Sequence, residues 1–117
     1  GDYDTALKYL EQSLKIRREI GDKAGTIPTL HNMAHIALGA NDIEKALRYW
    51  SEALSIAMET RNAEGIFHVA GILGQLLAQL GDKEQATKLL ELAIQVGRQS
   101  GFPGTDRLEE TLKTLAE

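Results

Sequence analysis

Apolar and polar positions follow one another along this chain in a helical pattern that returns every 40 residues. In the stretch 43–57 the apolar positions lie three or four residues apart, which is the spacing of one face of an α-helix. They are Ile43, Ala46, Leu47, Trp50, Leu54 and Ala57. The pattern predicts an amphipathic helix there, with one copy a period earlier and another a period later.

The copies also repeat the signals that begin and end a helix. Each copy follows an aspartate, whose carboxylate can accept hydrogen bonds from the unpaired amides of a first helical turn. These predicted N-caps are Asp2, Asp42 and Asp82. Directly upstream, Asn41 and Gly81 are expected to take the left-handed conformation that ends a preceding helix.

Two further helices are predicted between these copies, roughly over residues 25–40 and 63–80. Each has an apolar edge with a small residue at its middle, Ala34 in the first and Gly74 in the second. A glycine inside a helix costs up to about 1 kcal/mol, so Gly74 indicates that a neighbouring helix approaches closely. Pro28 removes a backbone hydrogen bond, and we expect a late helix start or a kink at this residue.

A fixed period of this size is typical of stacked helical units, and it predicts one all-α array over residues 1–117 with about six helices. Its predicted parts are an outer helix of an incomplete repeat at 1–21, repeats of an inner plus an outer helix at 22–61 and 62–101, and a capping helix at 102–117. Because the incomplete repeat has no inner helix, its apolar edge is expected to lose a packing partner. That edge contains Leu7, Leu10 and Leu14.

Composition and charge narrow the classes of function. The absence of cysteine excludes disulfides, thiolate metal sites and cysteine nucleophiles. A net charge of -4 offers no basic surface for a phosphate backbone. The longest mainly apolar stretch, residues 66–80, is shorter than the about 20 residues that a membrane span needs. We therefore expect a cytoplasmic protein that binds neither nucleic acid nor membrane.

The order of large, small and aromatic positions resembles the tetratricopeptide repeat (TPR), in a longer form of 40 residues. The positions that carry the resemblance are Leu30, Met33, Ala34, Ala37, Ala46, Tyr49, Trp50 and Ala53, with a second copy at Ala70, Leu73, Gly74, Leu77, Gly81, Ala86, Leu90 and Ala93. Repeats of similar length occur in kinesin light chains, Pins-like adaptors and Rap-type regulators. The resemblance implies a right-handed superhelical solenoid of antiparallel helix pairs. It also implies a non-catalytic protein–protein interaction module, as part of a larger adaptor or regulator.

In this family the inner helices line a concave groove that holds protein segments. Carried over position by position, the resemblance assigns the groove to Pro28, His31, Asn32, His35 and Leu38 on the first inner helix. On the second it selects His68, Gly71, Ile72, Gln75 and Gln79. Their polar groups can bond an extended backbone, so we expect a neutral or mildly acidic peptide partner. Because imidazole gains charge within the physiological pH range, we also expect pH-dependent binding.

Other uses of these residues find less support. Asn32 alone matches the carboxylate clamp of chaperone-binding members, and residues 25–40 and 63–80 contain no Lys or Arg. His31 and His35 have the spacing of a two-histidine zinc site, but no neighbouring Glu or Cys supports one. We predict no metal and no cofactor.

Catalysis is not predicted either, because the chain contains no nucleophile elbow, phosphate loop or dinucleotide fingerprint. The alternative to a groove ligand is a structural spacer or a self-association module. In the second case the chain would form a homo-oligomer through the open N-terminal edge.

Overall fold

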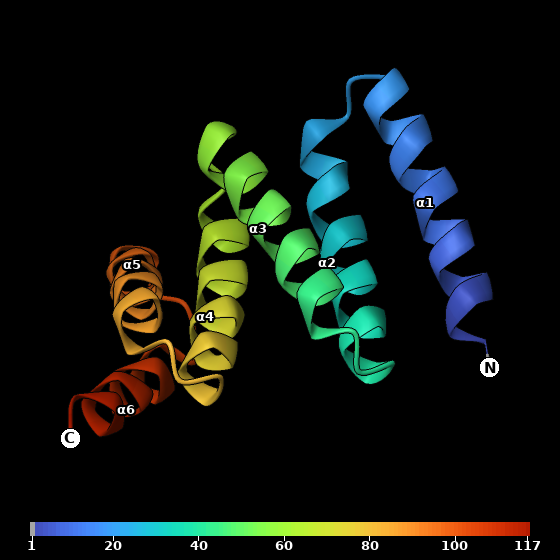
Figure 1. Cartoon of the computed structure of the whole chain (residues 1–117). Coiled ribbons are helices and arrows are strands. Elements are labelled where there is room, and N and C mark those ends of the chain that lie inside the picture. Colours follow the sequence, from blue (N-terminus) through green and yellow to red (C-terminus); the bar gives the residue numbers. More distant parts are fainter. Residues whose placement is uncertain (1) are drawn as a thin grey trace. The chain divides into compact units, whose positions relative to one another are not determined.

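The computed structural model describes residues 2–117 and folds this part of the chain into α-helices without strands (Figure 1). The chain divides into two compact units, of which the first ends at Asn62 and the second begins at Ala63. The first unit contains α1 (Tyr3–Glu19), α2 (Lys23–Gly39) and α3 (Ile43–Glu59). The second contains α4 (Ala63–Gln79), α5 (Lys83–Ser100) and α6 (Thr105–Ala116). The predicted all-α repeat fold is confirmed.

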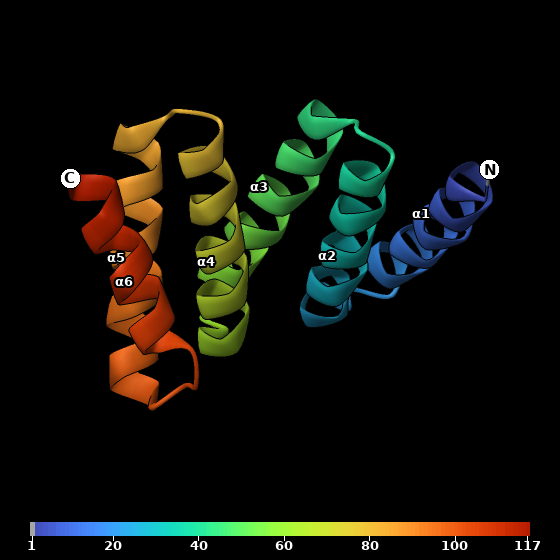
Figure 2. The same ribbon diagram turned by 90° about the horizontal axis from the view of Figure 1, so that it is seen from below.

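Within each unit, successive helices run in opposite directions and pack side by side (Figures 1 and 2). In the first unit, α2 lies between α1 and α3 and contacts both. The hydrophobic core of the first unit is formed by side chains of all three helices: Leu7, Leu14, Ile27, Leu30, Met33, Ala34, Ala37, Ala46, Trp50, Ala53 and Ala57. The two leucines of α1 are buried, which corrects the expectation that they lose their packing partner. Leu10 is only half-buried, as an edge without full cover requires.

In the second unit, α4 and α5 approach closely at two glycines. A Cβ atom on Gly74 would lie 2.9 Å from Leu90 Cγ, so the absence of a side chain permits the contact that the sequence predicts. A Cβ atom on Gly97 would lie 2.6 Å from the ring of Phe67. Each glycine therefore lies where a large side chain of the opposite helix fills the space.

Helix α6 covers the far side of this pair and closes the second unit. Leu108 is buried, and it would lie 3.3 Å from a Cβ atom on Gly71 of α4. Arg98 Nε of α5 donates to Glu109 Oε1 of α6 at 3.1 Å, and this hydrogen bond lowers the pKa of the half-buried Glu109 carboxyl. An apolar inner edge and charged outer positions make α6 the cover of α4 and α5.

The predicted N-caps hold at two of three places. Asp42 Oδ1 accepts from Lys45 N at 3.2 Å, and Asp82 Oδ1 accepts from Gln85 N at 3.1 Å. Asp2 precedes α1 but makes no side-chain capping bond in the described part of the chain. Asp2 is thus the N-cap residue of α1 by its position, but the predicted hydrogen bond to its carboxylate is absent.

The helix ends follow one turn geometry. Asn41 and Gly81 have φ angles of 62° and 91°, which confirms the left-handed conformation predicted for both. The same conformation occurs at Gly21 and Arg61, with φ of 75° and 53°. The turns at Gly21, Asn41 and Gly81 let the chain reverse within a few residues, which brings successive helices of one unit together.

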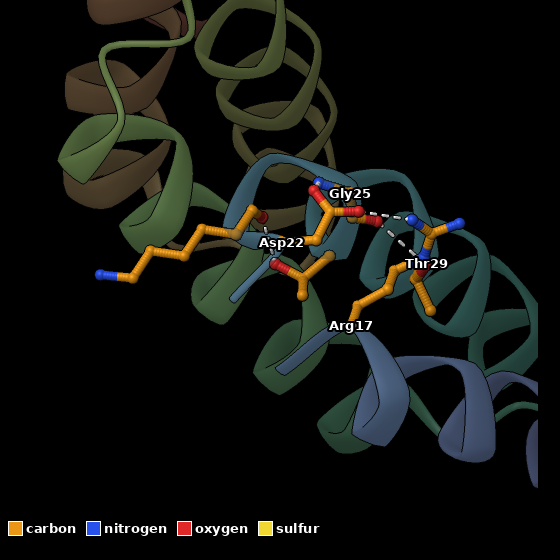
Figure 3. A network of polar contacts seen from close by, with 6 residues as sticks. Arg17, Asp22, Gly25 and Thr29 are labelled. Atoms are coloured by element: carbon orange, nitrogen blue, oxygen red, sulfur yellow. Dashed lines mark hydrogen bonds and ion pairs between the residues drawn. The ribbon is translucent and has the colours of Figure 1, made fainter. Parts of the chain in front are cut away.

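Helix α2 begins at Lys23, ahead of Pro28, so the expected late start is wrong. The physical reason is a cap at Asp22, whose Oδ1 accepts from Gly25 N at 3.0 Å. Arg17 Nη1 of α1 donates to Asp22 Oδ2 at 2.7 Å and holds this carboxylate in place (Figure 3). A cap supported from the neighbouring helix fixes the first turn before the proline is reached.

Pro28 then lies in the second turn of α2, between two buried threonines. Thr26 Oγ1 donates to the Lys23 carbonyl at 2.5 Å, and Thr29 Oγ1 donates to the Gly25 carbonyl at 3.1 Å (Figure 3). Buried hydroxyls need such partners, and these two find them within the same helix. Hydrogen bonds from a threonine on each side of Pro28 thus stabilise the start of α2.

The glycine contacts give a test of the packing. We expect Gly97→Ala to lower the free energy of unfolding by about 1 to 3 kcal/mol, because its Cβ overlaps the Phe67 ring. The matched control is Gly39→Ala at the end of α2, where a Cβ would meet Tyr3 at an ordinary 3.4 Å. We expect that variant to be neutral or stabilised by up to about 1 kcal/mol. Urea unfolding measures both, and equal stability of the two variants would contradict the packing.

Candidate functional site

The outward edge of α2 carries most of the predicted groove positions of the first unit. Pro28, Asn32 and His35 are exposed, and they lie four and three residues apart along one side of the helix. His31 and Leu38 are half-buried beside them. The opposite edge of α2 carries its core residues, so this row faces away from the hydrophobic core of the unit.

The two histidines of α2 are joined to the core by a chain of hydrogen bonds. Trp50 of α3 is completely buried, and its indole Nε1 donates to His31 Nδ1 at 3.0 Å. His31 Nε2 lies 3.2 Å from His35 Nε2. The His35 ring also stands edge-on to Trp50, with ring centroids 5.1 Å apart. The prediction that His31 and His35 share a helical face is confirmed, and Trp50 is the residue that fixes them.

The direction of these hydrogen bonds follows from the indole. A tryptophan N–H only donates, so it requires the unprotonated nitrogen of His31 at Nδ1. In the neutral ring the proton is then on Nε2, where it can donate to His35 Nε2. Neutral His35 in turn has its proton on Nδ1. The arrangement therefore leaves His35 Nδ1–H as a hydrogen-bond donor on an exposed side chain.

This chain of bonds also uses the nitrogens that a metal ion would need. A metal bound at His31 Nε2 would displace the proton from that nitrogen, while Nδ1 must stay unprotonated to accept from Trp50. Neutral imidazole cannot satisfy both requirements. The geometry at His31 and His35 therefore suits hydrogen bonding to a ligand better than zinc ligation.

On α4, the predicted positions have different surroundings. His68 is exposed, 4.0 Å from Glu64 and with its ring centroid 5.2 Å from that of Phe67. Ile72 is half-buried, whereas Gly71 is buried and lies against Leu108 of α6. Gly71 thus supports the packing of α6 on α4 in this unit.

Gln75 and Gln79 line an open hollow between α4 and α6. Its other lining residues are Ala78, Lys83, Arg107, Glu110, Thr111, Thr114 and Leu115. The hollow combines amide, cationic, anionic and hydroxyl groups with the apolar side chains of Ala78 and Leu115. The sequence did not indicate that α6 contributes to it, because the contact depends on how α6 folds back.

Trp50 is the second residue that sequence reasoning missed as part of the site. It was assigned to the apolar face of an outer helix, which is correct for its ring. A buried indole N–H nearly always requires an acceptor, and this rule could have pointed to a polar partner on the neighbouring helix.

The hydrogen bonds that join Trp50, His31 and His35 predict unequal effects of two substitutions. We expect His31→Ala to lower the free energy of unfolding by about 1 to 3 kcal/mol, because the buried Trp50 N–H loses its acceptor. His35→Ala removes an exposed side chain and should cost less than about 1 kcal/mol. Urea unfolding followed by the fluorescence of Trp50, the only tryptophan, measures both. The assignment fails if His35→Ala is the more destabilising of the two.

No described helix is long and apolar enough to cross a membrane. The sequence matches the family model of the tetratricopeptide repeat over residues 1–59 and again over residues 28–99. It is also similar to human trafficking protein particle complex subunit 12, with 32% identity over 95 residues, which are 81% of this chain. The chain spans only 12% of the length of that relative. Since the family model matches most of its length, the chain belongs to the tetratricopeptide repeat family.

Proposed function

We propose that this chain is a protein-interaction module that binds extended peptide segments at its inner helices, α2 in the first unit and α4 in the second. Membership of the tetratricopeptide repeat family supports an interaction or scaffold role. The observation that carries the proposal is His35, an exposed side chain held from behind by a buried tryptophan. A surface residue fixed in advance loses little conformational freedom when a ligand binds, which favours binding.

The groups on α2 define the chemistry of the ligand. His35 offers a donor at Nδ1, and the Asn32 carboxamide offers both a donor and an acceptor. These match the carbonyl and amide groups of a peptide backbone. Pro28 and Leu38 add apolar surface at the two ends of the row. We therefore propose an extended segment with small apolar side chains as the ligand of α2.

On α4, the same function uses His68, Gln75 and Gln79. The hollow beside the two glutamines includes two cationic side chains, Lys83 and Arg107, and one anionic one, Glu110. This balance favours a neutral or mildly acidic segment, because an acidic group finds more opposite than like charge there. The ligand proposed for α4 is thus a neutral or mildly acidic peptide segment.

The similarity to a larger protein is compatible with such a role. The human relative is, by its name, a subunit of a trafficking protein particle complex. A subunit of a complex needs surfaces that hold other proteins. We propose that this chain serves in the same general way, as an interaction part of a larger adaptor or regulator.

Peptides selected from a random display library test the proposal. We expect selected peptides to lose at least about tenfold in affinity when Asn32→Ala, His35→Ala and Gln75→Ala are combined, because each loses a polar contact. Isothermal titration calorimetry on the folded variants measures the change. The matched control combines Gln12→Ala and Arg48→Ala, two exposed positions on outer helices. Equal affinity of the triple variant and the native chain would rule out groove binding.

The hydrogen bonds between Trp50, His31 and His35 predict that peptide affinity depends on pH. Protonated His31 or His35 donates from both ring nitrogens, so the bonds Trp50–His31–His35 are satisfied only when both rings are neutral. We expect the affinity for a selected neutral peptide to be lower at a mildly acidic than at a mildly alkaline pH, because imidazole gains charge as the pH falls. Titrations at the two pH values measure it. A His35→Ala variant with the same pH dependence would show that other groups cause it.

A further inference from the structure

The two histidines of α2, His31 and His35, form a pair whose hydrogen bonds are satisfied in one protonation state. Trp50 Nε1 donates to His31 Nδ1 at 3.0 Å, and His31 Nε2 lies 3.2 Å from His35 Nε2. When both rings are neutral, each of these contacts joins one N–H donor to one unprotonated nitrogen. A further proton turns both nitrogens of one ring into donors. At one of the two contacts, two N–H groups then face each other, and that hydrogen bond is lost.

Burial decides which of the two bonds is lost. Trp50 is completely buried, so its indole N–H has no acceptor without His31, and an unsatisfied buried donor is costly. His35 is exposed, and its charged ring can donate both N–H groups to water after it turns away from His31. The added proton therefore resides on His35, and the bond from Trp50 to His31 remains.

The ionisable groups around the pair come from all three helices of the first unit. Residues 24–39 of α2 contain no ionisable side chain except the two histidines. Helices α1 and α3 place the following ionisable groups against α2 or beside Trp50: Tyr3, Arg17, Arg48, Tyr49 and Glu52. Glu52, the one carboxylate of this set, forms an ion pair with Arg18. Among these groups no carboxylate is left for a charged His35, so an acidic ligand is the partner that fits it.

We propose that a proton on His35 changes the ligand that α2 selects. The inference rests on the peptide site proposed above for this helix. Neutral His35 is held by His31 and directs one donor, Nδ1–H, at a peptide carbonyl. Charged His35 leaves that position and forms a stronger, charge-assisted hydrogen bond with a carboxylate. The site therefore selects a neutral segment at mildly alkaline pH and a segment with an Asp or Glu side chain at mildly acidic pH.

Binding of an acidic segment and protonation of His35 assist each other. The carboxylate favours the charged ring, so its complex takes up a proton from the solvent wherever the free chain holds His35 neutral. A neutral segment has the opposite effect, because it favours the neutral ring that His31 fixes. The two kinds of ligand thus differ in the sign of the proton exchange as well as in affinity.

Selection of peptides from one random display library at both pH values tests the proposal. We expect the peptides selected at mildly acidic pH to share an Asp or Glu that the others lack. Replacing that residue by its amide should weaken binding at least about tenfold at the acidic pH and less than about twofold at the alkaline pH. Calorimetry in buffers of different ionisation enthalpy should show that the acidic peptide takes up as much as about one proton.

Two matched variants assign the effect to His35. His35→Asn keeps a hydrogen-bonding side chain that cannot gain charge, so the acidic peptide and its amide should bind alike at both pH values. His68→Asn makes the same change at the exposed histidine of α4 and should leave the difference between the two peptides intact.

The indole of Trp50 reports the position of the proton without any ligand. Trp50 is the only tryptophan, so its indole N–H gives a single NMR signal. We expect this signal to keep its hydrogen-bonded chemical shift at mildly acidic pH while the ring signals of His35 move. In Trp50→Phe the indole donor is absent, so His31 can keep its proton on Nδ1 and accept from charged His35. A folded Trp50→Phe variant should therefore lose less affinity for a neutral peptide at the acidic pH.

The outcomes separate this inference from the proposed function. An equal effect of the amide replacement in the native chain and in His35→Asn, with peptide binding intact, would overturn the inference alone. So would loss of the indole hydrogen bond at mildly acidic pH, because the proton would then reside on His31. Failure to select any peptide that depends on Asn32 and His35 at either pH would overturn both.

Discussion

The fold depends on close contact between the middle of an inner helix and the outer helix that follows it. Gly74 against Leu90 is its clearest instance, because a single added carbon would lie 2.9 Å from Leu90 Cγ. Gly97 and Phe67 repeat the arrangement with the roles reversed. Dispersion and apolar burial both fall steeply when such surfaces separate. The side of α4 that faces solvent therefore follows from the contacts on its opposite side.

Much of this scaffold could be predicted because its causes are local. The aspartate caps at Asp42 and Asp82, and the left-handed turns at Asn41 and Gly81, need only the residues around them. The start of α2 could not be predicted, because Asp22 is held there by Arg17 of a different helix. The low helix propensity of Pro28 is outweighed by the contact between Arg17 and Asp22, which exists only once α1 and α2 are packed.

The candidate site shows the same division. The shared face of His31 and His35 follows from their spacing along a helix, and it was predicted. The bond from Trp50 to His31 joins two helices, so no spacing within either of them reveals it. Gly71 was assigned to the groove by its position in the repeat, yet in the second unit it lies against Leu108 of α6. Which positions of α4 remain available is decided by α6.

The repeat also explains why α1 and α2 differ in what they can bind. On α2, polar side chains are fixed by contacts with α3, so the surface offers directed hydrogen bonds to a backbone. On α1, the exposed side chains Tyr9, Ile16 and Ile20 are large and apolar. Directed polar groups select a ligand by geometry, whereas exposed apolar side chains select it by shape. The first compact unit thereby presents two surfaces of different chemistry, because the period fixes which side of each helix is buried.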